Sequence, residues 1–194
     1  HMNHRSVNKI PSSKILKVAL DLFSSRGYSE TKMVEIAQNV GLSVGALYLR
    51  FKNKEELFGE LIKDQSKDFI DRTKNLPEND PMKALKTYIA LNIEYAFQKR
   101  QLISIFFREY NLTFLKPLRK NFFKTQHKII KNILTAGIKK GIFRPMDIED
   151  TASIIFASIR GAILLKLIFG IGDVKTMSNS LFNLITNGIR KDAL

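Results

Sequence analysis

The sequence predicts an all-α protein of about nine helices, because apolar residues recur at helical spacing through almost all of it. Glycine and proline gather in a few short connectors, and no segment alternates between polar and apolar residues as a strand does. The 194 residues are 44% hydrophobic, which is enough to build a buried core. There is no cysteine, which excludes thiol catalysis and a disulfide framework and fits a cytoplasmic location.

Three short helices are expected in the first 52 residues. Ser12 and Ser13 offer N-caps for the first, whose apolar stripe runs through KILKVALDLFSSRG. Thr31 can cap the second, which ends before the Gly41 turn, and Ser43 can cap the third. A second and third helix joined by a tight glycine turn are typical of a helix-turn-helix.

Longer helices are expected after Asn53, which with Glu56 gives a capping-box start. The segment PENDP (77–81) is the clearest break. The apolar stretch 154–171 is interrupted by Arg160 and Lys166, so we interpret it as a helix buried on most sides and predict no membrane span. The expected helices cover residues 54–75, 82–100, 101–110, 118–140, 148–169 and 174–189.

The third helix can be oriented from Leu47, since successive helical residues are rotated by about 100°. With Leu47 inward, an exposed face results, bordered on one side by Val44. Such a face fits the major groove of DNA, and only Arg50 on it suits bidentate recognition of guanine. Lys32, Lys52 and Lys54 lie beside helix N-termini, which favour phosphate. The predicted face consists of Gly45, Ala46, Tyr48, Leu49 and Arg50.

Residues 15–58 resemble the TetR family of bacterial transcriptional repressors. The family pattern is a helix ending in Phe-x-x-x-Gly-Tyr, then Thr and Ile-Ala before the glycine turn, then Leu-Tyr-x-x-Phe-x-[Asn/Ser]-Lys-x-x-Leu. Val34 stands where the family frequently has Arg, and Leu49 where it often has an aromatic residue or His. The matching residues are Phe23, Gly27, Tyr28, Thr31, Ile36, Ala37, Gly41, Leu47, Tyr48, Phe51, Asn53, Lys54 and Leu57.

The resemblance implies two domains. Residues 1–52 would form the DNA-binding domain, with a disordered N-terminal arm and His1 as a cloning remnant, and residues 53–194 a helical ligand-binding and dimerisation domain. It implies a homodimer that binds a palindromic operator in double-stranded DNA and is released by a small-molecule effector. By the same resemblance, the DNA contacts would come from Thr31, Ser43, Gly45, Ala46, Tyr48 and Lys54.

Candidate effector and dimer residues follow from composition and position. Aromatic side chains crowd the middle of the chain, where each one alone is as well explained by core packing. Arg160 lies in an apolar run and needs either a structural carboxylate or a ligand as its partner. The candidate effector residues are Tyr88, Phe97, Phe106, Phe107, Tyr110, Phe123 and Arg160. The resemblance implies a dimer that forms through the last two long helices, with candidates Ala157, Gly161, Leu164, Leu181, Leu184 and Ile185.

The net charge of +14 is concentrated in residues 81–144, which hold 14 basic and two acidic side chains. A solvated face explains this excess, as does an amphipathic and possibly anionic effector. Two rival functions stay open: a non-specific, nucleoid-like DNA-binding protein, and a protein that binds a membrane surface through its cationic middle. The sequence offers no nucleophile–base pair, metal-ligand spacing or phosphate-binding loop, so we expect no enzymatic activity, metal or cofactor.

Overall fold

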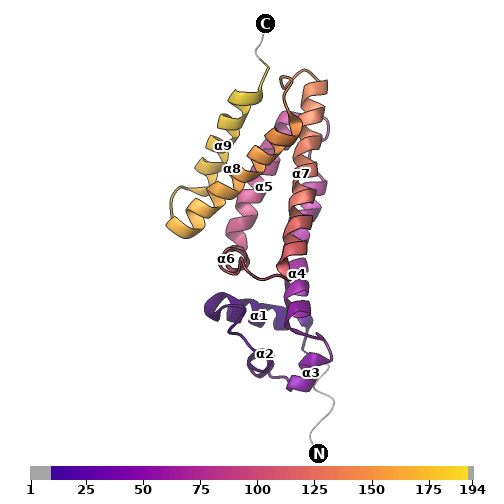
Figure 1. Ribbon diagram of the computed structural model, residues 1–194, viewed down its shortest axis with the longest axis vertical. Coiled ribbons are helices and arrows are strands. Elements are labelled where there is room, and N and C mark those ends of the chain that lie inside the picture. Colours follow the sequence, from indigo (N-terminus) through magenta and orange to yellow (C-terminus); the bar gives the residue numbers. More distant parts are fainter. Residues whose placement is uncertain (1–9, 192–194) are drawn as a thin grey trace, which may run out of the picture. The chain divides into compact units, whose positions relative to one another are not determined.

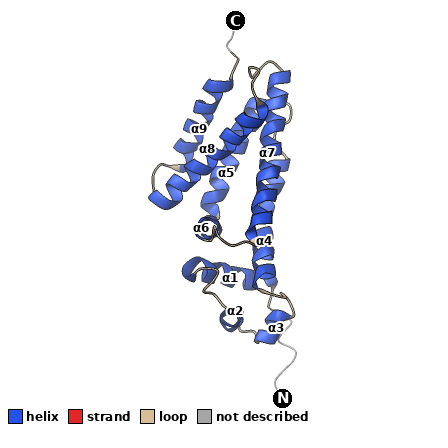
Figure 2. Cartoon of the chain, in the orientation of Figure 1, coloured by secondary structure: helices blue, strands red, loops and turns tan. Residues whose placement is uncertain are grey.

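A computed structural model describes residues 10–191, and every regular element within this range is a helix (Figures 1 and 2). The all-α prediction is confirmed. The expected N-terminal arm and the His1 remnant lie outside the described residues. The helices are α1 (Ser12–Arg26), α2 (Met33–Val40), α3 (Val44–Tyr48), α4 (Lys54–Lys74), α5 (Pro81–Gln98), α6 (Arg100–Arg108), α7 (Leu115–Lys139), α8 (Ile148–Phe169) and α9 (Val174–Ile189).

The chain divides into two compact units. The first comprises the described residues up to Lys67 together with Lys99–Leu112, and the second comprises Asp68–Gln98 and the residues from Thr113 onwards. The first unit thus includes α6 and the beginning of α4. The division of function at residues 52 and 53 stays a prediction.

Aromatic packing holds the first unit together. Phe23 at the end of α1 and Phe58 on α4 meet edge to face with ring centroids 5.5 Å apart, and Tyr28 lies 5.2 Å from both rings. Such pairs add to the free energy gained by burying the rings. The ring of Phe106 on α6 lies 6.1 Å from Phe58. The end of α1, the start of α4 and α6 therefore share one core.

Two polar side chains attach the end of α6 to this core. Arg108 donates from Nη2 to the carbonyl oxygens of Phe23 and Ser24, at 2.7 and 3.0 Å. These carbonyls belong to the last turn of α1, where a cation is favoured. Glu109 accepts from the backbone N–H of Tyr28 at 2.9 Å. Backbone carbonyl groups of α1 therefore serve as the partners of Arg108.

The cap predictions have mixed outcomes. Ser43 caps α3 by accepting from Ala46 N–H at 3.2 Å, as predicted. Asn53 Oδ1 accepts from Glu56 N–H at 2.7 Å, which is one half of the predicted capping box, whereas the Glu56 carboxylate accepts from the Lys52 backbone N–H instead of that of Asn53. The predicted caps at Ser12 and Ser13 are wrong. Pro11 is the N-cap residue of α1, and both serines lie inside the helix because its first turn starts directly after the proline ring.

The second unit is built around α5, which packs on α7, α8 and α9. Its buried residues include Leu85, Tyr88 and Ile89. The turn after α7 is closed by Phe143, which is buried and lies over Gly137, and the segment following this turn pairs with the end of α9. On α7, Lys116, Lys120, Lys124 and Lys128 are all exposed, as expected for a solvated basic face.

Helix α8 buries a single stripe rather than most of its surface. Ala152, Ile155, Ile159 and Ile163 are buried at helical spacing, whereas Ile154 and Ile168 are exposed. The expectation of burial on most sides is wrong for a single chain. Among the described residues, α8 alone is long and apolar enough to cross a membrane, by length and composition only. Its stripe packs on helices of the same unit, so an open apolar face is left in one copy of the chain.

Candidate nucleic-acid interface and effector site

Helix α3 presents most of the face that its sequence predicts. Leu47 is fully buried, Gly45 and Tyr48 are exposed, and Leu49 is 89% exposed. Although α3 ends at Tyr48, Leu49 keeps helical dihedral angles, so its predicted direction holds. Ala46 is the exception: it is only 7% exposed because α3 packs against α2 on that side. The predicted outward direction of Ala46 is therefore wrong, whereas its contact with DNA stays a prediction.

Arg50 follows α3 and is half-buried. Its Nη1 donates to the carbonyl oxygen of Ile10, the residue before Pro11. The guanidinium therefore ties the start of the first unit to the end of α3. To contact a guanine it would have to release this carbonyl or use its other donors. Its role in base recognition stays a prediction.

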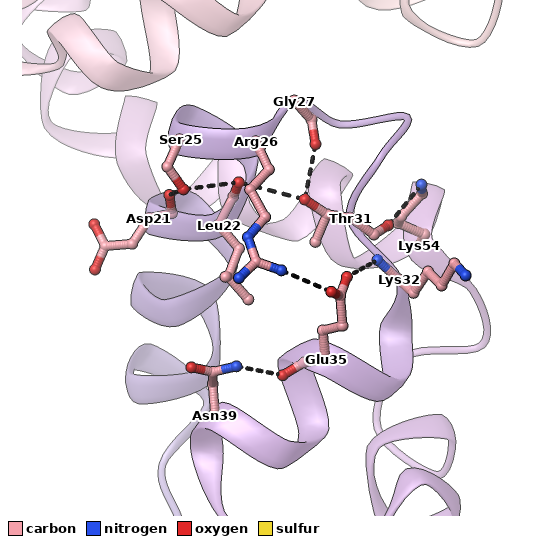
Figure 3. Close-up of polar contacts among 10 residues, drawn as sticks. All are labelled: Asp21, Leu22, Ser25, Arg26, Gly27, Thr31, Lys32, Glu35, Asn39 and Lys54. Atoms are coloured by element: carbon pink, nitrogen blue, oxygen red, sulfur yellow. Dashed lines mark hydrogen bonds and ion pairs between the residues drawn. The ribbon is translucent and has the colours of Figure 1, made fainter.

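Thr31 has a structural role that the sequence did not reveal (Figure 3). Its side chain is fully buried, and its hydroxyl donates to the carbonyl oxygen of Gly27 at 2.7 Å. The predicted Thr31 cap is wrong, because Lys32 occupies the N-cap position and the Glu35 carboxylate accepts from its backbone N–H at 2.9 Å. Glu35 also pairs with Arg26 at 2.7 Å. The Thr31 hydroxyl is thus already bonded within the protein, and the contact of Thr31 with DNA stays a prediction.

The three lysines expected near phosphate differ in availability. Lys32 and Lys52 are exposed, whereas Lys54 is half-buried. The Lys54 ammonium donates to the carbonyl oxygens of Tyr28 and Thr31, at 2.7 and 2.9 Å, and lies 4.4 Å from the centroid of the Tyr28 ring. Burial lowers the pKa of Lys54, and the charges of Glu109 and Glu30 oppose this shift. Lys54 thus joins α4 to the turn between α1 and α2.

Val44, the last of the predicted contacts, is half-buried at the start of α3.

The predicted effector residues fall in different units. Phe106, Phe107 and Tyr110 belong to the first unit, where Phe106 packs on Phe58 and Tyr110 is 74% exposed. Helix α6 belongs to the first unit because it packs on α1, a contact between distant parts of the chain that spacing along the sequence does not reveal. The role of these seven residues in effector binding stays a prediction. The remaining four, Tyr88, Phe97, Phe123 and Arg160, belong to the second unit.

Arg160 lies among aromatic rings that the sequence did not select. Its guanidinium carbon is 4.7 Å from the centroid of Phe122 on α7 and 5.3 Å from that of Phe156 on α8. Phe122 belongs to the aromatic-rich middle of the sequence, and the spacing of four residues between Phe156 and Arg160 places both on one helix face. The Tyr88 hydroxyl donates to Gln126 Oε1 at 2.9 Å.

The predicted dimer residues are accessible within their unit. Ala157, Gly161 and Leu184 are exposed, and Leu164, Leu181 and Ile185 are half-buried. Ile168 and Phe169, two further apolar residues at the end of α8, are exposed as well. This apolar surface on α8 and α9 is available to a partner.

Three short helices, the third with exposed Gly45, Tyr48 and Leu49, define a helix-turn-helix DNA-binding protein. Comparison with known proteins shows which helix-turn-helix proteins this chain resembles. Residues 15–61 match the family described as "Bacterial regulatory proteins, tetR family". The chain is 28% identical over 191 residues to the "Fatty acid metabolism regulator protein" of Bacillus subtilis, covering 91% of this chain and 94% of that one.

Two further similarities extend along the chain. QacR, an HTH-type transcriptional regulator of Staphylococcus aureus, is 26% identical over 187 residues, covering 92% of this chain and 97% of that protein. A solved structure of a putative fatty acid metabolism regulator from Clostridium perfringens superposes with a TM-score of 0.76 at 25% identity, covering 92% and 100% of the two chains. Residues 15–61 therefore carry the DNA-binding domain of the TetR family, and similarity to regulators of this kind extends along the chain.

Proposed function

We propose that this regulator is a repressor that binds a palindromic operator as a homodimer, in the cytoplasm, and is released by a small-molecule effector. The observation that carries the DNA-binding part is the exposed face of α3. Tyr48 and Leu49 point to solvent while Leu47 anchors the helix in the core. Large apolar side chains held outward on a short, capped helix suit contact with base edges and thymine methyl groups in a major groove.

Two copies of α3 would enter successive major grooves, about 34 Å apart, on one side of the DNA. The exposed apolar residues of α8 and α9 support a dimer, since contiguous apolar surface of this kind marks an interaction site. Ser43, Gly45, Tyr48 and Leu49 would contact the DNA, together with Lys32 and Lys52 at phosphates.

The effector part of the proposal is supported by the aromatic surroundings of Arg160 in the second unit. The Bacillus subtilis relative is called a fatty acid metabolism regulator, which favours an effector with an apolar part. Helix α6 lies between α5 and α7 in the chain, and Arg108 and Glu109 attach it to the DNA-binding unit. A shift of α6 would therefore change the position of the end of α1. A coupling of about 1–3 kcal/mol would lower operator affinity roughly 5- to 150-fold.

Selection of bound fragments from the source genome, followed by competition binding, tests this proposal. The selected sites should share a near-palindromic sequence, and the protein should prefer that sequence to random DNA by about 10³-fold or more at physiological salt. Equal competition by random DNA would favour the nucleoid-like alternative. Sedimentation with anionic vesicles tests the membrane-surface alternative, which requires strong vesicle binding without operator binding.

A further inference from the structure

The Arg160 guanidinium has an aromatic environment but no anion beside it. Within residues 10–191 it makes no hydrogen bond or ion pair, and its contacts are the rings of Phe122 and Phe156. Burial lowers the pKa of Arg160, and the hydroxyl groups of Tyr88 and Tyr95 raise it. No carboxylate acts on it. A partly desolvated guanidinium without a counter-charge is costly, so a specific partner is expected.

The guanidinium nitrogens can nevertheless be reached from outside. Among the described residues, no buried side-chain nitrogen or oxygen lacks a hydrogen-bond partner. Since Arg160 makes no hydrogen bond there and its side chain is half-buried, its nitrogens are in reach of solvent. The five N–H donors of the guanidinium are therefore unused within the described residues and are not sealed from solvent.

Tyr95 provides a second open polar group. Its half-buried ring stacks on Phe69 with centroids 4.6 Å apart, and its hydroxyl makes no hydrogen bond within the described chain. Burial raises the pKa of Tyr95 to about 12 against the opposing charge of Arg160, so the hydroxyl stays protonated at neutral pH. The Tyr88 hydroxyl is different, because Gln126 already accepts its proton. The Phe69 ring in turn lies 6.3 Å from the ring of Phe122, on which Arg160 lies, so two unused donors from α5 and α8 share one group of aromatic rings.

We propose that Arg160 and Tyr95 bind the carboxylate of an amphipathic effector, whose apolar part packs on Phe122 and Phe156. A carboxylate matches the fork of a guanidinium with two parallel hydrogen bonds. A cationic effector is disfavoured, since the protein's own cation already lies on these rings. The excess of 14 basic over two acidic side chains in residues 81–144 also favours an anion. This inference rests on the proposed effector control.

Calorimetric titration of the full chain tests the head-group preference. Three probes with the same ten-carbon tail, decanoate, 1-decanol and decyltrimethylammonium, are titrated below their aggregation concentrations. Decanoate should bind about 10- to 100-fold more tightly than 1-decanol, as charge-assisted hydrogen bonds require. Equal binding of decanoate and 1-decanol, or tighter binding of the cation, would overturn the proposal.

Variants assign the effect to the two side chains. Arg160→Gln should abolish the preference for decanoate while leaving the affinity for 1-decanol within about twofold. Lys166→Gln removes a charge from the same helix outside the aromatic environment and should keep the preference. Tyr95→Phe should lower decanoate affinity about 2- to 10-fold. It serves as the test if Arg160→Gln does not fold, and unchanged decanoate affinity in Tyr95→Phe would then contradict the assignment.

A DNA-binding measurement separates this inference from the proposed function. Fluorescence anisotropy with the selected operator is recorded with and without decanoate. Release of the operator by the wild type and not by Arg160→Gln supports both proposals. Arg160-dependent binding of decanoate without any change in operator affinity would support the carboxylate site and contradict its control of DNA binding.

Discussion

Two neighbouring lysines illustrate how residues of one type differ in role at the residue scale. The Lys54 ammonium is bonded to the carbonyl oxygens of Tyr28 and Thr31, whereas Lys52 is exposed and its ammonium makes no hydrogen bond within residues 10–191. Lys52 lies just before α4 and Lys54 is its first residue, and the sequence alone predicted that both contact DNA phosphates. Only Lys52 is free to neutralise a phosphate without first breaking contacts in the protein.

Lys54→Ala should therefore lower the free energy of unfolding by about 1–3 kcal/mol, since two buried or half-buried carbonyls lose a charged donor. Lys52→Ala should leave that free energy within about 0.5 kcal/mol. It should instead weaken binding to all DNA sequences alike and reduce the slope of log affinity against log salt concentration by about one, as expected for the loss of one phosphate contact. Chemical denaturation and binding at several salt concentrations measure the two effects. An equally stable Lys54→Ala protein would contradict the structural role.

Arg50→Ala tests base recognition by the single guanidinium near the exposed face of α3. If Arg50 contacts guanine, its loss should relax the preference at one or two base pairs, at about 1–3 kcal/mol each. Binding to operators substituted at each position gives the answer, and Lys52→Ala is the control with unchanged preference. Unchanged preference in Arg50→Ala would contradict base recognition by Arg50 and leave it a structural role, which includes its bond to the Ile10 carbonyl oxygen.

At the scale of elements, the turn after α7 depends on a close approach that only glycine allows. A Cβ atom on Gly137 would lie 2.0 Å from Cδ2 of Phe143, whose ring is buried. Gly137→Ala should therefore destabilise the protein by about 1–3 kcal/mol, although alanine favours a helix. Gly59→Ala in α4 meets no atom within 4 Å and should be neutral or stabilising. Thermal unfolding compares the two, and a smaller residue at position 143 should restore part of the loss.

The start of α9 depends on the ionisation of Asp173. Its carboxylate accepts from the Thr176 backbone N–H at 3.0 Å and from the Thr176 hydroxyl at 3.1 Å. These bonds, with the backbone one first, lower the pKa of Asp173 below its usual 3.8. The stabilisation is thus fully present above that value and is lost as the pH falls through the lower, folded-state pKa.

Asp173→Ala should accordingly lower the melting temperature at pH 5 to 7, and the difference from the wild type should shrink below a pH of about 4. Melting temperatures recorded as a function of pH give the comparison. Asp71→Ala is the control, because the Asp71 carboxylate is exposed and makes no hydrogen bond or ion pair within the described residues. A difference that persists unchanged to pH 2 would contradict a role for the charged form.

For the whole molecule, the proposed dimer makes a prediction at Leu184, which is 73% exposed on α9. Leu184→Glu should convert a dimer to monomers, because it places a charge in an apolar interface. Operator affinity should fall about 100-fold or more, since each head would then bind alone. Sedimentation velocity and operator binding measure both. Leu118→Glu on α7 also adds a charge at an exposed leucine and should remain dimeric; dissociation of both variants would place the interface elsewhere.

Local patterns in the sequence were sufficient for the helices and for the family. Helical spacing, glycine turns and the caps at Ser43 and Asn53 depend on residues a few positions apart, so they can be recognised along the chain. Helices α8 and α9 begin and end where the pattern predicts. The outward direction of Leu49 follows from Leu47 in the same way, because helix geometry alone relates them.

Only the tertiary structure decided which polar groups are already occupied. The burial of Thr31, the carbonyls held by Lys54 and Arg108, and the packing of Phe106 on Phe58 all involve residues on other helices. Arg160 differs from these residues because its guanidinium has no hydrogen-bond or ion-pair partner, and no carboxylate approaches it within the described chain. A sequence pattern predicts the direction in which a side chain points from its own helix. The partner it meets depends on how helices pack, and packing is set by contacts between residues distant in sequence.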